Sequence, residues 1–283
     1  MVQTYLVPPL GDLPVAELTS RDVVPVLRKI GASAPDLARK ARQYVQSILR
    51  YAMREGLREE GRALVLDDVI PRAANRAHIP AATMPDEAAN VMRAILDYPS
   101  AVTRAALLVC AYTAQRPGLV AAMRWEDIAL DALEWRIPAS LMKTRHAHIV
   151  PLPCQVVALL REMRLYTAGR SYVFPPLARQ KSQHLHRDAL SKALREMGFR
   201  GRHATHGFRA MFRTLARERL GIDSDILEAQ LAHAKPGEVQ AAYDRTAFTD
   251  ARRKAMQQWA DWLDELALTQ SGATGSLKGS KGA

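Results

Sequence analysis

The sequence is poor in cysteine and contains no long apolar run. Its 283 residues include two cysteines, Cys110 and Cys154, both in largely apolar stretches of sequence. Two thiols at this spacing predict neither a disulfide framework nor a metal site, and they are typical of a reducing cytoplasm. The longest apolar stretches, such as residues 105–112, are far shorter than a membrane span, and the N-terminus shows no basic-then-apolar signal sequence. We therefore expect a cytoplasmic protein without membrane contact.

Acidic residues are also in deficit, with 29 Asp and Glu against 40 Lys and Arg and a formal net charge of +11. Such an excess favours a polyanionic partner, nucleic acid first of all, although a solvated basic surface is the simple alternative. The distribution of charge helps to decide, because residues 179–219 contain eleven Lys or Arg and three acids. This local excess favours a binding face.

The N-terminal part of the chain has helical periodicity. A short helix is expected from Arg21 and a longer one from Ser33, where residues 33–36 have the pattern of a capping box. The apolar positions expected to pack in the longer helix are Leu37, Ala41, Tyr44, Val45, Ile48 and Ala52. Periodicity then fades in a basic stretch with several prolines. We expect a helical domain at residues 1–74, followed by a linker at residues 75–85.

A larger domain is expected at residues 86–268. Residues 86–96 and 101–112 have helical patterns, the second ending at Pro117, and the chain after Pro153 again favours helices. Residues 133–137 and 148–152 have the composition of strands and predict a short antiparallel sheet. The last helix is expected at residues 250–268, and the composition of residues 269–283 is typical of a disordered tail. The predicted fold class is mainly α, with two domains and one small sheet.

The C-terminal two thirds carry residues suited to attack on a phosphodiester. Without a metal, that reaction needs fixed cations, proton carriers and a nucleophile, because negative charge grows on the nonbridging oxygens. Arg116 stands at the junction of an apolar helix and a turn, where an arginine is more often a cap or a surface charge. His206 and Arg209 are three residues apart at a helix start, so both side chains can face one phosphate. A structural histidine beside a surface arginine is the alternative.

A third element pairs a histidine with a tyrosine across a loop. His233 is followed ten residues later by Tyr243, with the turn-forming residues 235–238 between them. Taken alone, Tyr243 is more often a core aromatic than a nucleophile. Lys143 lies in the polar span between the two expected strands, where Arg145, His146 and His148 compete for the same role.

The ordered set of these residues, each in its local setting, resembles the tyrosine recombinases of bacteriophages and genomic islands. The set is Arg116, Lys143, His206, Arg209, His233 and Tyr243. The resemblance is strongest over residues 107–266, and its most specific stretches are Arg-Pro-Gly at 116–118, Thr-His-Gly-Phe-Arg at 205–209 and Gln-Leu-Ala-His at 230–233. It implies a helical core-binding domain, here residues 1–74, and a mostly helical catalytic domain, here residues 86–268. The two would close round DNA as a clamp.

The resemblance also implies a role for each residue. Arg116 and Arg209 would bind nonbridging oxygens, since planar guanidinium groups suit phosphate. Tyr243 would attack to leave a 3′-phosphotyrosyl bond and a free 5′-hydroxyl, so that no cofactor is required. Lys143 would protonate the departing oxygen, His206 would assist proton transfer, and His233 would hydrogen-bond a nonbridging oxygen. No metal or other cofactor is expected.

The implied partners are double-stranded DNA attachment sites, three further copies of the chain in a synaptic tetramer, and accessory DNA-bending or directionality proteins. A C-terminal segment exchanged between neighbours is expected, with Trp259, Trp262 and Leu263 as its apolar anchors. The chain lacks room for an N-terminal arm-binding domain, which predicts a truncated or naturally short member that cleaves core sites without distinguishing integration from excision.

Two positions depart from the family pattern. Ala114 replaces a glycine, which restricts the turn, and Leu119 replaces an acid that would support the arginines. These changes keep open the alternative of a DNA-binding remnant with lost or reduced catalysis. A type IB topoisomerase-like strand-passing enzyme is a further alternative, disfavoured by the helical N-terminal segment and the integrase-like motifs.

Overall fold

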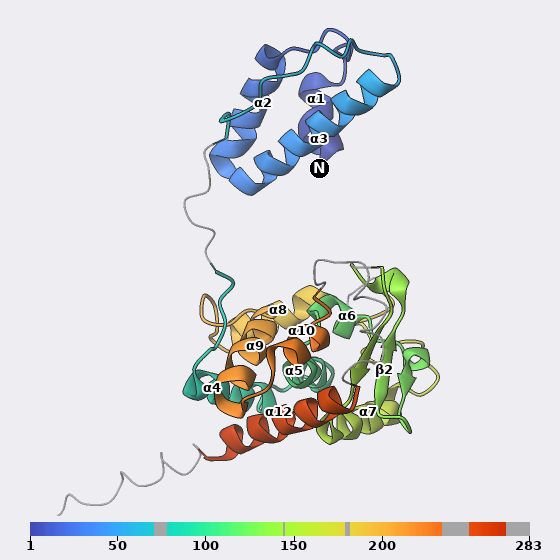
Figure 1. Ribbon diagram of the computed structural model, residues 1–283, viewed down its shortest axis with the longest axis vertical. Helices are drawn as coiled ribbons and strands as arrows, with labels where there is room; N and C mark the ends of the chain where they lie inside the picture. The colour runs from blue at the N-terminus through green and yellow to red at the C-terminus, as the bar shows by residue number, and fades with distance from the viewer. Residues whose placement is uncertain (71–77, 144, 179–181, 234–248, 270–283) are drawn as a thin grey trace, which may run out of the picture. The chain divides into compact units, whose positions relative to one another are not determined.

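The computed structural model describes residues 1–70, 78–143, 145–178, 182–233 and 249–269 (Figure 1). The chain divides into two compact units, Met1–His78 and Ile79–Ala283. Helices dominate both units and the second contains one small antiparallel sheet, which confirms the predicted fold class. The expected linker lies partly, and the expected tail almost wholly, outside the described residues. Within the described residues, no helix is both long enough and apolar enough to span a membrane.

The first unit is a small helical assembly. It contains the short turns η1 (Val2–Leu6) and α1 (Val7–Leu10) and the longer helices α2 (Ser20–Ser33) and α3 (Pro35–Arg54). The helices α2 and α3 pack against each other. The unit buries a core of its own, comprising Leu6, Leu18, Val23, Leu27, Ile30, Ala38, Ala41, Val45, Leu49, Leu66 and Ile70.

The capping box predicted at Ser33 is wrong. The capping box of this region forms at Thr19, whose backbone N–H donates to Asp22 at 2.8 Å, so the first helix is longer than expected and begins at Ser20. Ser33 is the last residue of that helix. Pro35 begins α3, and a proline excludes its predecessor from the helical conformation, which is why Ala34 has φ −146° and ψ 79°.

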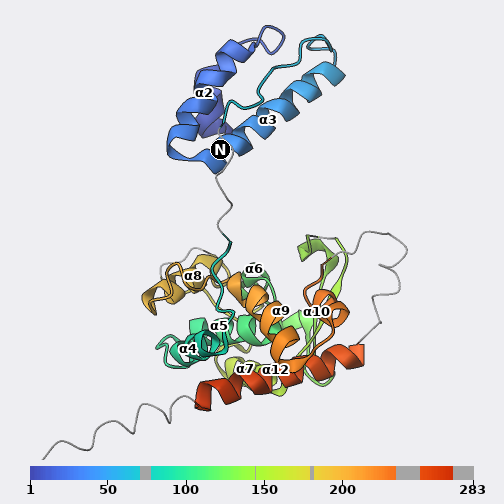
Figure 2. The ribbon, with the colours of Figure 1, turned by 60° about the vertical axis from the view of Figure 1, so that its left-hand side comes forward.

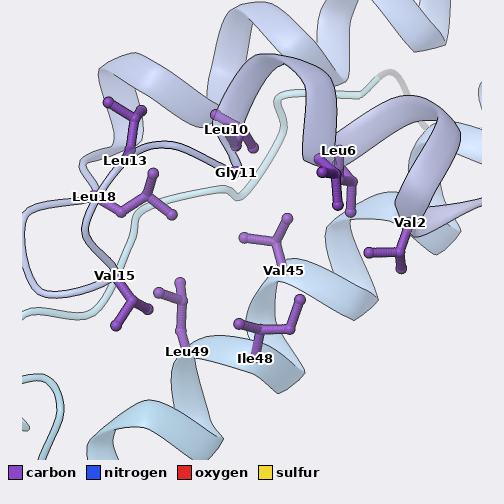
Figure 3. A pocket seen from close by; sticks show the side chains of 11 residues that line it. Val2, Leu6, Leu10, Gly11, Leu13, Val15, Leu18, Val45, Ile48 and Leu49 are labelled. Atoms are coloured by element: carbon purple, nitrogen blue, oxygen red, sulfur yellow. The ribbon is translucent and has the colours of Figure 1, made fainter.

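The buried face of α3 differs from the predicted stripe. Ala38, Ala41, Val45, Leu49 and Ala52 are its buried residues. Tyr44 and Ile48 are instead 48% and 45% exposed. Ile48 lies on the rim of an apolar pocket of about 180 Å³ between α3 and the N-terminal turns (Figure 3). The apolar stripe predicted for this helix therefore included two positions, Tyr44 and Ile48, that are not part of its buried face.

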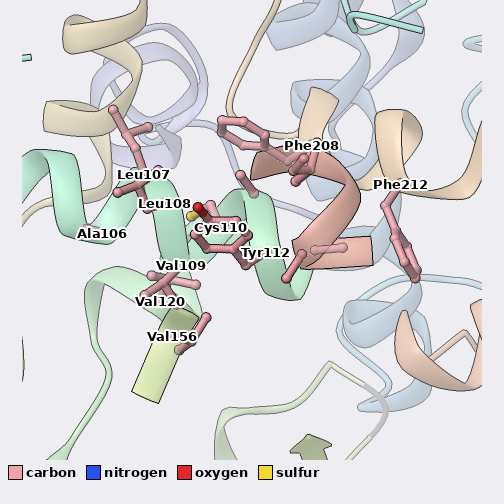
Figure 4. Close-up of a cluster of buried hydrophobic side chains, with 14 of the residues drawn as sticks. Ala106, Leu107, Leu108, Val109, Cys110, Tyr112, Val120, Val156, Phe208 and Phe212 are labelled. Atoms are coloured by element: carbon pink, nitrogen blue, oxygen red, sulfur yellow. The ribbon is translucent and has the colours of Figure 1, made fainter. Parts of the chain in front are cut away.

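The second unit is built round α5 (Ala101–Thr113), in which every residue from 105 to 113 is buried. A helix that is apolar on all sides belongs in a core. The helices packed against it are α4 (Pro85–Leu96), α6 (Pro117–Ala121), α7 (Cys154–Thr167), α8 (Arg187–Glu196), α9 (Gly207–Leu220) and α12 (Thr249–Thr269). Figure 4 shows Tyr112 and its neighbours on α5 among side chains from α6, α7 and α9. The predicted helices at 86–96, 101–112 and 250–268 are confirmed.

The sheet has three antiparallel strands in the order β1 (Ile128–Ala129), β2 (Glu134–Ile137) and β3 (His148–Pro151). Trp135 pairs with Val150, and Ile137 pairs with His148. The two predicted strands are confirmed, whereas β1 was not predicted because two residues carry no periodic signal.

The helix α12 runs along one side of the second unit in both ribbon views (Figures 1 and 2). Trp259 and Leu263 are fully buried, and the indole N–H of Trp259 donates to the carbonyl of Ala111 at 2.9 Å. Trp262 is stacked on Trp259. The side chains expected to anchor an exchanged segment therefore pack within their own unit, which argues against that use of them.

Candidate functional site

The turn between α5 and α6 places the first candidate residue. The helix α5 ends at Thr113, one residue beyond the predicted range, and Ala114 follows in the left-handed conformation with φ 53° and ψ 25°. Pro117 begins α6 rather than ending α5, and Arg116 is the residue that precedes it as the N-cap. The chain thus reverses within three residues. Arg116 therefore lies in the turn that joins the two packed helices α5 and α6.

The guanidinium of Arg116 is only partly satisfied by the protein. Its Nη1 is buried and has no hydrogen-bond partner among the described residues. Leu119, three residues later, is half-buried against the apolar core and supplies no acceptor. A buried donor without an acceptor costs about 1–3 kcal/mol, and an anionic ligand relieves that cost. Arg116 is therefore suited to receive an oxyanion.

Arg209 lies in the first turn of α9 and is buried. Its Nη1 donates to the carbonyl of Ala114 at 2.9 Å, and its Nη2 donates to the carbonyl of Leu231 at 2.7 Å. Burial lowers the pKa of Arg209 to about 10, with a further contribution from the charge of Arg116. Arg209 therefore stays charged near neutral pH, and together with Arg116 it makes this part of the site strongly positive.

His206 is exposed and directly precedes α9. Partial loss of water around its ring lowers the pKa of His206, and the charges of Arg209 and Arg116 lower it further. The imidazole is therefore neutral near pH 7, and one ring nitrogen can accept a proton. The spacing of His206 and Arg209 brings both to one place, as the sequence predicted.

His233 contacts Arg209 directly, with 2.9 Å between its Nε2 and Nη2 of the arginine. Because a guanidinium only donates, Nε2 must accept, and the ring proton belongs on Nδ1. That nitrogen donates to Oε2 of Glu228 at 2.5 Å. The neutral tautomer of His233 is thus determined by its two neighbours.

Gln230, at the end of α10 (Ser224–Gln230), joins the surrounding elements and was not predicted as a site residue. Its side-chain amide donates to the carbonyl of Thr113 at 2.9 Å. Its own carbonyl accepts from Nε2 of Gln115 at 2.8 Å and from Nε2 of His148 at 3.1 Å. Burial lowers the pKa of His148 to about 4, followed by the effect of Arg252, so this ring is neutral. Gln230 therefore ties the Arg116 turn to β3.

Two predicted residues are not placed in this cluster. Lys143 is exposed in the turn between η3 (Ala139–Leu141) and β3, and in the described part of the chain it makes no hydrogen bond or ion pair. Tyr243 lies outside the described residues. The structure thus brings together four predicted residues, Arg116, His206, Arg209 and His233. The described ranges contain no group of three or more His, Cys, Asp or Glu able to hold a metal ion.

Two known family models match most of the chain. Residues 83–249 match the phage integrase family, and residues 1–68 match the phage integrase central domain. The chain belongs to the phage integrase family. The integrase of Shigella phage Sf6 is 32% identical over 268 residues, which cover 94% of this chain and 69% of that protein.

The relatives that match this chain are longer than it is. Prophage integrase IntA of Escherichia coli K12 is 30% identical over 258 residues, covering 90% of this chain and 61% of that protein. The chain therefore spans about three fifths of that relative's length.

Solved structures share the fold at low identity. A lambda integrase tetramer bound to a Holliday junction has a TM-score of 0.58 at 18% identity, covering 82% of this chain and 68% of that chain. The recombinase XerH in a post-cleavage complex has a TM-score of 0.59 at 13% identity, covering 86% of this chain and 73% of that chain.

Proposed function

We propose that the chain is a site-specific DNA recombinase that cleaves and rejoins DNA through a phosphotyrosyl bond to Tyr243. The observation that carries this proposal is the buried, unpartnered Nη1 of Arg116, which lies close enough to Arg209 for their charges to interact. A protein that holds two arginines together and leaves a buried N–H of one without an acceptor stabilises an anion there. Membership of the phage integrase family makes a DNA phosphate the natural anion.

Phosphate binding falls to the two arginines in this proposal. A guanidinium has five N–H donors, and the bonds of Arg209 to Ala114, Leu231 and His233 use three of them. The remaining N–H groups of Arg209 and Nη1 of Arg116 serve nonbridging oxygens. Because these donors are held before substrate arrives, they stabilise the charge of the transition state without reorganising.

Proton transfer is assigned to the flanking residues. Tyr243 attacks phosphorus as the bond to the 5′-oxygen breaks, which leaves a 3′-phosphotyrosyl ester and a 5′-hydroxyl. His206, kept neutral by its partial burial and by the charges of the arginines, assists removal of the phenolic proton, and Lys143 donates a proton to the departing oxygen. His233 supports the binding of a nonbridging oxygen through Arg209, because its Nε2 accepts from Nη2 of that arginine and holds the guanidinium in place.

Residues 1–74 act in this proposal as a core-binding domain and residues 86–268 as the catalytic domain of a clamp round duplex DNA. The match of residues 1–68 to the phage integrase central domain supports the first assignment. The lambda integrase tetramer on a Holliday junction supports four copies acting together on DNA. Accessory DNA-bending or directionality proteins and a cytoplasmic location belong to the same proposal.

A nicked suicide duplex carrying the core attachment site tests the activity. Cleavage releases a short strand, so religation fails and the covalent adduct accumulates. The wild type should form the adduct and Tyr243→Phe should not. Tyr166→Phe is the matched control, because Tyr166 is 71% exposed at the end of α7. Duplex binding without any adduct from the wild type would overturn the proposal.

One observation favours a second candidate, a DNA-binding remnant without catalysis. Ala114 occupies a left-handed conformation that suits glycine, and Leu119 supplies no acceptor to Arg116. Both departures affect the support of the arginine pair rather than the pair itself. The suicide duplex separates the two candidates, because a remnant binds the site and leaves it uncut.

A further inference from the structure

Glu228 is an acid at the centre of the candidate site that has no assigned role. It belongs to α10, its side chain is 19% exposed, and its negative charge raises the pKa of Arg209 against the opposing effects of burial and Arg116. The motifs of the sequence did not single it out. Glu228 precedes His233 by five residues, and that separation does not place two side chains on the same face of a helix. The sequence therefore predicted no contact between them.

The two carboxylate oxygens of Glu228 have different partners. Oε2 accepts from Nδ1 of His233 at 2.5 Å, and Oε1 pairs with Nε of Arg213 at 2.7 Å. Arg213 follows Arg209 by four residues on α9, so both arginines lie on one face of that helix. Glu228 therefore contacts α9 directly through Arg213 and indirectly through His233.

The tautomer of His233 depends on this carboxylate. With the proton on Nδ1, Nε2 presents a lone pair to Nη2 of Arg209 at 2.9 Å. With the proton on Nε2, two donors would face each other, and Arg209 or the imidazole would have to move. An ionised carboxylate beside Nδ1 selects the first arrangement, because it only accepts.

We propose that Glu228 is a positioning residue that holds His233 in the Nδ1–H tautomer and thereby keeps Arg209 aimed at the phosphate. This inference rests on the proposed recombinase function. Glu228 does not touch the reacting atoms. It acts on the rate through His233 and Arg209, as outer carboxylates do for other orienting histidines.

The test compares Glu228→Gln and Glu228→Ala in single-turnover cleavage of the suicide duplex and in duplex binding. Removal of an orienting carboxylate costs about 10- to 100-fold in function. We expect that loss in cleavage rate for Glu228→Ala, with little change in Kd. Glu228→Gln should lose less, because its amide oxygen still accepts from Nδ1. Glu218→Gln, an exposed acid on α9, is the matched control.

A second measurement does not depend on cleavage. The nitrogen NMR shifts of His233 in the DNA-free protein should report the Nδ1–H tautomer in the wild type and a changed population in Glu228→Ala. A wild-type tautomer and a wild-type cleavage rate in folded Glu228→Ala would overturn the inference. If the wild type forms no adduct, the proposed function fails, and the tautomer shift still decides the role of Glu228.

Discussion

The carbonyl of Ala114 accepts a hydrogen bond from Nη1 of Arg209 at 2.9 Å, across 95 residues of sequence. Ala114 reaches this position only by adopting the left-handed conformation, with φ 53°. That conformation costs an alanine about 1–2 kcal/mol because its Cβ crowds the following carbonyl. The turn that supports the arginine pair is therefore strained in this chain.

Ala114→Gly should stabilise the protein. Glycine removes the left-handed penalty but loses more entropy on folding, so the net gain in the free energy of unfolding is about 0.5–1 kcal/mol. Chemical denaturation measures it. Ala122→Gly, at the C-cap of α6 where φ is −100° and brings no left-handed penalty, is the control and should destabilise. An equal loss in both variants would mean that residue 114 is not strained.

Arg116→Ala should abolish cleavage while the folded state keeps its stability. The substitution removes a buried N–H without a partner and a positive charge that opposes Arg209, so the melting temperature should stay constant or rise. The adduct assay and thermal unfolding measure the two effects. Arg217→Ala, exposed on α9, is the control. Unfolding of Arg116→Ala would instead show a structural arginine.

Gly207→Ala should damage the turn that carries His206. A Cβ at Gly207 would lie 2.5 Å from the carbonyl oxygen of Pro80, which also accepts from the backbone N–H of Ala204 at 2.9 Å. Relief of such a clash costs about 1–3 kcal/mol. We expect that loss of stability together with slower cleavage. Gly61→Ala, where the added Cβ meets no atom within 4 Å, is the control.

Stability should fall in mild acid because of two buried histidines. Burial lowers the pKa of His148 and of His203 to about 4, from 6.5. Between these values the unfolded chain binds more protons than the folded chain, so each histidine costs about 1.4 kcal/mol per pH unit as the pH falls. Denaturation across that window measures the slope. His203→Gln should reduce it by about half, and a flat profile would contradict the neutral buried state.

The elements that sequence patterns predicted are those whose signals are local. Residues 105–112 are apolar on every side, which indicates a buried helix, and the three-residue spacing of His206 and Arg209 places both side chains on one side of a helix start. The start of α3 was predicted wrongly because Ser33 matched a capping pattern while Pro35 determined the boundary. A proline outweighs a cap when the two signals overlap.

The contacts of Glu228 and Gln230 could not be predicted in this way. Gln230 bonds to Thr113 across 117 residues and to His148 across 82. Such partners meet only after the helices pack, and a single sequence carries no periodicity that pairs them. The conformation of Ala114 was predictable in part. The replacement of a glycine predicted a restricted turn, and the positive φ angle of Ala114 is one that glycine adopts more easily than alanine.

The most direct measurement is mass-spectrometric mapping of the peptide that carries DNA after trapping on the suicide duplex. Digestion of the adduct should yield a nucleotide-linked peptide from the segment containing Tyr243, with the modification on the phenolic oxygen. Exposed tyrosines such as Tyr44 and Tyr166 should be unmodified. A nucleotide on any other residue, or an unmodified Tyr243 in a protein that has cut its substrate, would contradict the assignment of Tyr243 as the nucleophile.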